Sequence, residues 1–118
     1  MASSIDETTI SLTRGDSFFT TVTMYRTDGS IYTPVEGDTI RFALKRNVMN
    51  SAKNEFLDKT PLILKDIPID TLMLHLTPED TKELNFGTYA YDIELTYANG
   101  DVDTFIADAK FILTRELH

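Results

Sequence analysis

Three polar residues in the last quarter of the chain have the spacing of metal ligands. Asn99, Asp101 and Asp103 stand at alternate positions, like the first ligands of a calcium-binding loop. Such a loop also needs a later glycine and a bidentate glutamate, and Lys110 stands where the glutamate should be. Calcium takes six or more oxygen ligands. The hairpin signal Asn99-Gly100 explains these residues better, and we expect no metal site.

The sequence contains few side chains of the types that usually act in catalysis. The sequence has no cysteine, and its two histidines are His75 and the terminal His118. One internal histidine makes neither a zinc site nor a proton relay, and its alternation with Met73 places it opposite the neighbouring leucines, as expected of a surface histidine. Neither a Gly-x-Ser-x-Gly elbow nor a glycine-rich phosphate loop occurs. We therefore predict that the protein is not an enzyme and holds no cofactor.

Two further patterns suggest chemistry or recognition only weakly. Asp92 and Glu94 lie on the polar side of a predicted strand, where carboxylates are usually solvated, although a glycosidase-type pair from distant strands stays open. Arg14-Gly15-Asp16 matches the tripeptide of integrin ligands, but a three-residue match has little specificity. A glycine where two strand patterns meet is better explained as a bend that carries the chain between two sheets.

The elements that must position these residues centre on a strand over residues 88–97. Apolar and aromatic residues alternate there with polar ones, which is the period of a half-buried strand. The inward positions are Tyr89, Tyr91, Ile93, Leu95 and Tyr97. Because the tyrosines share their face with Ile93 and Leu95, we expect them in the core, and a sugar-stacking platform is the alternative.

A short helical turn precedes this strand, beginning at Thr77 and ending at Leu84. Thr77 is the predicted N-cap, Pro78 the first helical residue and Asp80 the acid of a capping box. We expect the turn to connect one sheet to the other.

Shorter strand patterns fill the rest of the chain. Ile40, Phe42 and Leu44 point inward in a second core strand, and another strand is expected over residues 17–25. Asp28-Gly29, like Asn99-Gly100, predicts a type I′ hairpin turn. In the last strand the apolar phase shifts near Phe105-Ile106, which predicts a bulge. Seven or eight short strands and one helical turn predict an all-β fold, an antiparallel β-sandwich, with a small barrel as the alternative.

Residues 47–60 break the strand rhythm and are predicted to form a loop. A loop of this length in a compact domain is usually functional, mobile or partly helical. It is the candidate partner-binding segment, through the residues Asn47, Val48, Met49, Lys53, Glu55 and Phe56.

Length and charge narrow the class of protein. The 118 residues are most simply one domain, which we expect over residues 8–116 after a disordered N-terminus of residues 1–7. Nineteen acidic and eleven basic residues give a net charge of −8, which opposes binding to nucleic acid or to an anionic membrane. No signal peptide or membrane-spanning segment is recognised, so synthesis in the cytoplasm is expected.

Four segments together resemble the N-terminal β-sandwich domain of upper baseplate proteins, which are structural proteins of tailed bacteriophages and prophages. The segments are residues 10–18 (ISLTRGDSF), 38–45 (DTIRFALK), 76–84 (LTPEDTKEL) and 87–95 (GTYAYDIEL). They cover most of the chain in the expected order, and they are structural rather than catalytic motifs. This sequence lacks the receptor-binding or coiled-coil extension of longer family members, which leaves open whether it works alone.

The resemblance implies an immunoglobulin-like sandwich that serves as an assembly or attachment module of a virion, in the tail or baseplate. It implies protein–protein contacts with other phage structural proteins or with further copies in a homo-oligomer. The expected location is the bacterial host cytoplasm during synthesis and then the virion. The alternative function is a stand-alone carbohydrate-binding or adhesion module.

Overall fold

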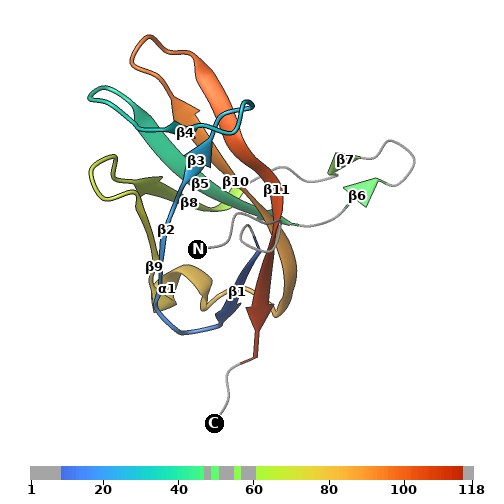
Figure 1. The fold of residues 1–118 in the computed structure, drawn as a ribbon. Helices are drawn as coiled ribbons and strands as arrows, with labels where there is room; N and C mark the ends of the chain where they lie inside the picture. The colour runs from blue at the N-terminus through green and yellow to red at the C-terminus, as the bar shows by residue number, and fades with distance from the viewer. Residues whose placement is uncertain (1–8, 47–48, 51–54, 57–60, 116–118) are drawn as a thin grey trace.

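The computed structural model describes residues 9–46, 49–50, 55–56 and 61–115. Figure 1 shows that this part of the chain is built almost entirely of strands. The predicted all-β class is therefore confirmed. The described residues form eleven strands rather than seven or eight, because the strand expected over residues 17–25 is interrupted and the segment predicted as a loop contains two more.

Five strands form the main sheet. Their order across the sheet is β1 (Ile10–Thr13), β11 (Val102–Thr114), β10 (Gly87–Thr96), β5 (Thr39–Arg46) and β8 (Pro61–Ile67). The strand predicted from alternation, β10, lies at the centre, between antiparallel β11 and β5. One face of β10 packs in the core, with Tyr91, Ile93 and Leu95 buried, while Glu94 on the other face is exposed, which explains its clear alternation.

The remaining strands form three two-stranded sheets. They are β2 (Phe18–Thr21) with β9 (Met73–Leu76), β3 (Met24–Tyr25) with β4 (Ile31–Tyr32), and β6 (Met49–Asn50) with β7 (Glu55–Phe56). The strand expected over residues 17–25 is thus divided, because its first part pairs with β9 and its second part with β4.

One pairing in the main sheet differs from the expected antiparallel pattern. β1 runs parallel to β11, with Ile10 opposite Phe111. After β1 the chain turns at Gly15 and enters the separate β2–β9 sheet, as the bend at this glycine predicted. Because β1 and β2 do not form a hairpin, β1 is not constrained to an antiparallel pairing and can lie parallel to β11.

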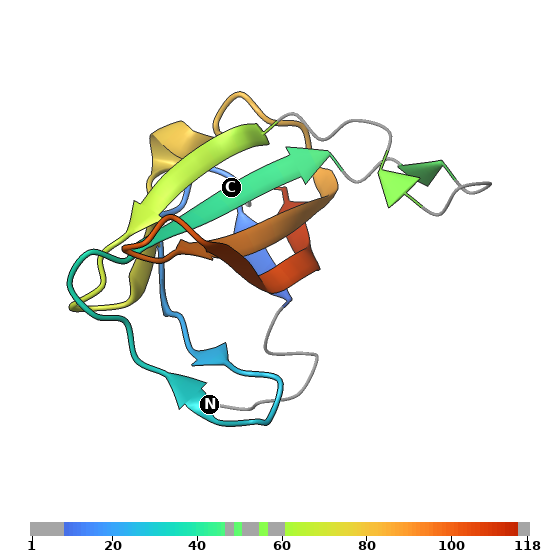
Figure 2. The same cartoon turned by 90° about the horizontal axis from the view of Figure 1, so that it is seen from above.

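The core joins the main sheet to the β2–β9 sheet (Figures 1 and 2). Leu74 and Leu76 of β9 are fully buried, as are Phe42 of β5 and Phe111 of β11. The ring of Phe42 packs against Tyr91 at a centroid distance of 5.3 Å and against Phe111 at 6.4 Å. Burial of each such side chain stabilises the fold by about 1.5–3 kcal/mol.

β11 contains two bulges against β10. Phe105 is an extra residue between the pairs Ile93–Ile106 and Glu94–Thr104, which confirms the predicted bulge. A second irregularity, which was not predicted, sets two residues of β11 opposite Asp92 and includes Asp108 at a positive φ of 53°. The two insertions together restore the inside–outside alternation of β11.

Both hairpin turns differ from the predicted type I′. Among the four central residues, only Gly29 and Gly100 have a positive φ, and each loop has three residues. The Arg26 N–H donates to the Ser30 carbonyl at 2.7 Å, and the Tyr97 N–H donates to the Asp101 carbonyl at 2.8 Å. In three-residue loops of this kind the glycine is the last loop residue and adopts the left-handed conformation. Asp-Gly and Asn-Gly occur both in these loops and in type I′ turns, so the dipeptide alone does not distinguish the two.

The helical turn α1 spans Pro78–Thr81 and is shorter than the expected segment from Thr77 to Leu84. Thr77 is its N-cap, and its N–H donates to the Asp80 carboxylate at 2.7 Å. The Lys65 ammonium lies 3.0 Å from the same carboxylate. Burial favours protonation of Asp80, but the hydrogen bonds from Thr77 and Lys65 outweigh it and hold its pKa below 3.8. As predicted, α1 connects the β2–β9 sheet to the main sheet.

We predict that Asp80→Ala lowers the free energy of unfolding by about 0.5–2 kcal/mol at neutral pH, the range of lost helix caps. Because the folded pKa of Asp80 is depressed, its contribution is present above pH 3.8 and is lost as the pH falls through the folded pKa. Urea unfolding of both proteins at several pH values should show a difference that shrinks in strong acid. Glu79→Ala, at the exposed neighbouring position, should cost less; an equal cost for both would contradict the capping role.

Candidate interaction site

The segment predicted as a partner-binding loop contains a short antiparallel pair. β6 and β7 set Met49 opposite Phe56 and Asn50 opposite Glu55. Figure 2 shows both strands beyond the end of β5, apart from the other sheets. The prediction of a loop without strand structure is therefore wrong at these four positions, where two short strands pair with each other between β5 and β8. Of the candidate residues, Met49, Glu55 and Phe56 lie in this pair, and Asn47, Val48 and Lys53 lie outside the described residues.

The Arg14-Gly15-Asp16 tripeptide is a structural turn. The Arg14 guanidinium donates to the Leu84 carbonyl at 3.2 Å and lies 4.4 Å from the centroid of the Phe86 ring. The Gly15 N–H donates to the Thr81 hydroxyl at 3.4 Å, and Gly15 has a φ of 91°. These contacts hold the arginine against the segment that follows α1, and an adhesion motif would have to present that side chain to a receptor.

The residues with calcium-like spacing serve the β10–β11 hairpin. The Asp101 N–H donates to the Asn99 side-chain oxygen at 2.9 Å, and Asp103 accepts a hydrogen bond from the Tyr97 hydroxyl at 2.6 Å. That hydrogen bond raises the pKa of Tyr97 to about 12. Across the described part of the chain, no group of three or more His, Cys, Asp or Glu side chains could hold a metal ion.

Asp92 is not simply solvated, because it belongs to an ion cluster on the outer face of the main sheet. The Lys45 ammonium lies 2.6 Å from Asp108 and 3.2 Å from Asp92, and Asp92 also accepts the Asp108 N–H at 2.7 Å. The Lys45 side chain is only 11% exposed. Burial alone would lower the pKa of Lys45, but the two carboxylates outweigh it and raise that pKa above 10.5. The amine is therefore protonated at neutral pH and fixes the bulged strand rather than acting as a nucleophile.

The two tyrosines of β10, and Tyr97 directly after the strand, lie where the core interpretation placed them. Tyr89 and Tyr91 are buried, and burial raises the pKa of Tyr91 to about 12. Tyr97 is partly buried and packs at the core margin, with its ring 5.7 Å from that of Tyr32. Two of the three rings that a sugar-stacking platform would need are thus inside the protein.

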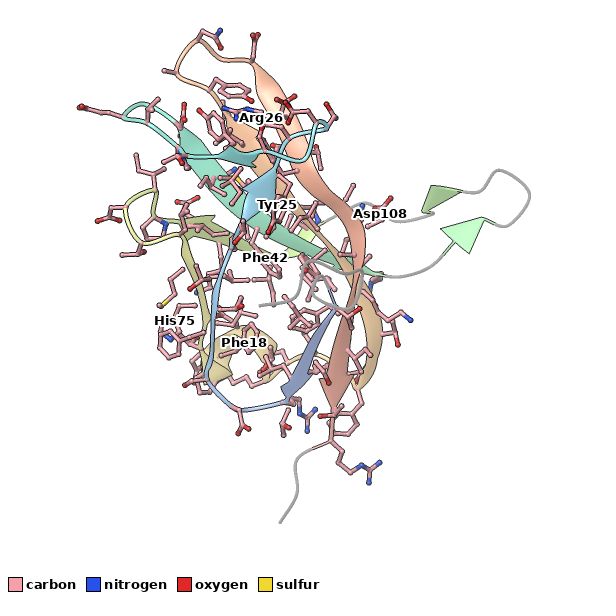
Figure 3. The ribbon with its side chains drawn as sticks, in the orientation of Figure 1. Phe18, Tyr25, Arg26, Phe42, His75 and Asp108 are labelled. Carbon is pink, nitrogen blue, oxygen red and sulfur yellow. The ribbon has the colours of Figure 1, made fainter. Side chains whose placement is uncertain are left out.

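The most exposed aromatic side chain that the structure describes belongs to β2. Phe19 is 58% exposed and stacks on His75 of β9, with ring centroids 4.0 Å apart and planes 9° from parallel. Met73, on the same outer face, is 39% exposed. Figure 3 shows His75 at the outside of this sheet, away from the buried ring of Phe42. Phe19, His75 and Met73 thus form a partly apolar surface, without acidic side chains of their own, on a strongly acidic protein.

The expected surface position of His75 is confirmed, but the sequence interpretation missed Phe19. Alternation through β2 placed Phe18, Val22 and Met24 inside, which leaves Phe19 on the solvent side. A large aromatic residue at an outward position of a strand without charged residues was the available signal.

Comparison of the chain with protein-family models, with curated proteins and with solved structures gave no match. No helix in the described part of the chain is long and apolar enough to cross a membrane.

Proposed function

We propose that the fold is an immunoglobulin-like β-sandwich. β11, β10, β5 and β8 follow the order of neighbours G, F, C and C′ in a variable-type domain, and β2 pairs with β9 as B pairs with E. The short helix α1 lies between β9 and β10, where such domains turn from strand E to strand F. The Tyr89 hydroxyl donates to the Asn85 carbonyl at 2.6 Å, which is the arrangement of a tyrosine corner at the start of strand F.

The proposed function is a non-enzymatic structural protein of a bacteriophage or prophage virion, in tail or baseplate assembly or attachment, acting through protein–protein contacts. The observation that supports it best is the placement of the four segments that resemble upper baseplate proteins. Residues 10–18, 38–45, 76–84 and 87–95 contain the first sheet crossing, a core strand, α1 and the central strand respectively. The four segments therefore coincide with the elements that define the fold. The step from a shared fold to a shared function is an analogy.

The alternative, a carbohydrate-binding or adhesion module, has less support. Its motives were the tyrosines of β10 and the Arg14-Gly15-Asp16 turn. Tyr89 and Tyr91 are buried, and Arg14 is held by the Leu84 carbonyl and the Phe86 ring.

The virion proposal predicts that the chain is present in purified particles. Mass spectrometry of gradient-purified phage induced from a host that encodes the chain should detect it at constant stoichiometry to tail proteins. The soluble fraction of the same lysate serves as the control for carry-over. Absence from particles, together with binding on a glycan array, would favour the alternative function.

A further inference from the structure

The edge of β2 is open in the described part of the chain. Among the described strands β2 pairs with β9 alone, and the Val22 N–H donates to the Leu72 carbonyl at 2.7 Å on that side. Because hydrogen-bonded positions alternate along an antiparallel pair, the backbone groups of Phe19 and Thr21 face the other side. These N–H and C=O groups form a row that another strand can pair with.

Other features protect the edge of β8 but not that of β2. β8 begins with Pro61, and its Lys65 side chain is held by Asp80 of α1, as is common in strands that avoid edge pairing. Residues 17–23, which include β2, contain neither proline nor any charged residue. The β2 edge is therefore suited to β-strand addition.

We propose that two copies of the chain pair their β2 edges antiparallel across a two-fold axis. In a continuous sheet the outer faces of both copies must coincide, so residues of the same face must oppose each other. A register centred on Phe19 meets this condition, with Phe19 opposite its own copy and Thr21 opposite Ser17 of the second copy. Both positions have backbone groups that point toward the new partner.

This register is self-complementary in side chains as well as in backbone. It forms a four-stranded sheet in the order β9, β2, β2, β9, and the outer face gains a row of rings, His75, Phe19, Phe19 and His75. Aromatic pairs directly opposite each other stabilise antiparallel strands. The segment 17–23 contains no charged residue, so its own side chains bring no charge into the contact. A basic or acidic partner would find no complementary charge on this strand, which favours a second copy as the occupant.

Ionic strength distinguishes this contact from a charge-driven one. Each copy carries a net charge of −8, so the copies repel one another at long range. Added salt screens that repulsion, and dimer formation should therefore strengthen with salt. An interface of one short strand per copy lies at the low end of specific interface sizes, so a weak, concentration-dependent dimer is expected.

Sedimentation equilibrium of the purified 118-residue chain tests the proposal. The native protein should shift from monomer to dimer with concentration, and Phe19→Lys should weaken dimerisation by at least about tenfold, because it sets two like charges against each other at the axis. Ile31→Lys is the matched control, since Ile31 of β4 is 57% exposed and should leave the dimer unchanged. A native protein that stays monomeric at all concentrations and salt levels overturns the proposal, as do equal effects of the two variants.

A single introduced cysteine tests the register, because the chain has none of its own. Directly opposed residues in a hydrogen-bonded antiparallel pair have Cα atoms about 5.5 Å apart, within the range that a disulfide spans. Phe19→Cys should form a disulfide-linked dimer under mild oxidation, and Ile31→Cys should not. Equal cross-linking of both variants overturns the two-fold register.

The inference goes beyond the proposed virion function and does not depend on it. Both experiments use the isolated protein, whereas the virion proposal is tested on particles. A chain that dimerises but is absent from particles would support the dimer and contradict the virion function.

Discussion

Ile93→Asp should abolish the folded state. Ile93 is 2% exposed at the centre of β10, opposite Phe42 of β5 and Ile106 of β11. The change loses about 1.5–3 kcal/mol of apolar burial and places a carboxyl group in the core at a further cost of about 2–7 kcal/mol, even if the group is protonated. The sum is comparable with the whole free energy of unfolding of an ordinary domain, about 5–15 kcal/mol.

Circular dichroism and thermal melting would measure this loss. The expected spectrum lacks strand signal, and no cooperative transition should remain. Val102→Asp is the matched control, because Val102 lies on neighbouring β11 with 53% exposure, and it should melt close to the native protein. A near-native melting temperature for Ile93→Asp would show that this face of β10 is not the core.

Gly37→Ala should cause the second largest loss of stability among the changes considered, about 2–5 kcal/mol, from two separate causes. Gly37 has a φ of 97°, where an L side chain costs about 1–2 kcal/mol. Its added Cβ would also lie 2.7 Å from the Cβ of Ala98, in the β10–β11 hairpin. Overpacking of this kind costs about 1–3 kcal/mol. The adjacent Asp38, which accepts the Tyr32 hydroxyl at 2.6 Å, would be displaced with the turn.

Gly29→Ala separates the two causes. Gly29 has nearly the same φ, 90°, but no atom of the described residues lies within 4 Å of the position that an added Cβ would occupy. Urea unfolding should therefore show the backbone cost alone in Gly29→Ala and a cost roughly twice as large in Gly37→Ala. Equal losses in the two variants would mean that the turn at Gly37 and the β10–β11 hairpin do not pack against each other as described.

Local signals in the sequence predicted local structure well. The alternation that defines β10, the cap formed by Thr77 and Asp80, and the bulge at Phe105 each depend on neighbouring residues, and each is present. The turn types were wrong because Asp28-Gly29 and Asn99-Gly100 are compatible with both two-residue and three-residue loops. The register of the flanking strands decides between these loops.

Features that depend on distant residues could not be predicted. Lys45 meets Asp108 across 63 positions, and only the second bulge of β11 turns Asp108 toward it. The open edge of β2 likewise depends on which strands pair. The sequence of β2 predicts a strand, but it does not indicate whether that strand has a neighbour on one side or on both. The candidate interaction site thus depends on the pairing of strands, whereas its exposed aromatic residue could be found from alternation.

The parallel pairing of β1 with β11 has a consequence for biosynthesis. The ribosome makes β1 long before its strand partner, because Ile10 pairs with Phe111. Such long-range contacts are slow to form, because the entropy of closing the intervening chain is lost before the contact stabilises anything. The nascent chain therefore cannot complete its main sheet until β11 has left the exit tunnel, and β10 lacks its central-strand environment until then. Throughout that interval β1 and β10 present unpaired backbone edges, because both pair with β11, and these are the surfaces that a chaperone would have to cover.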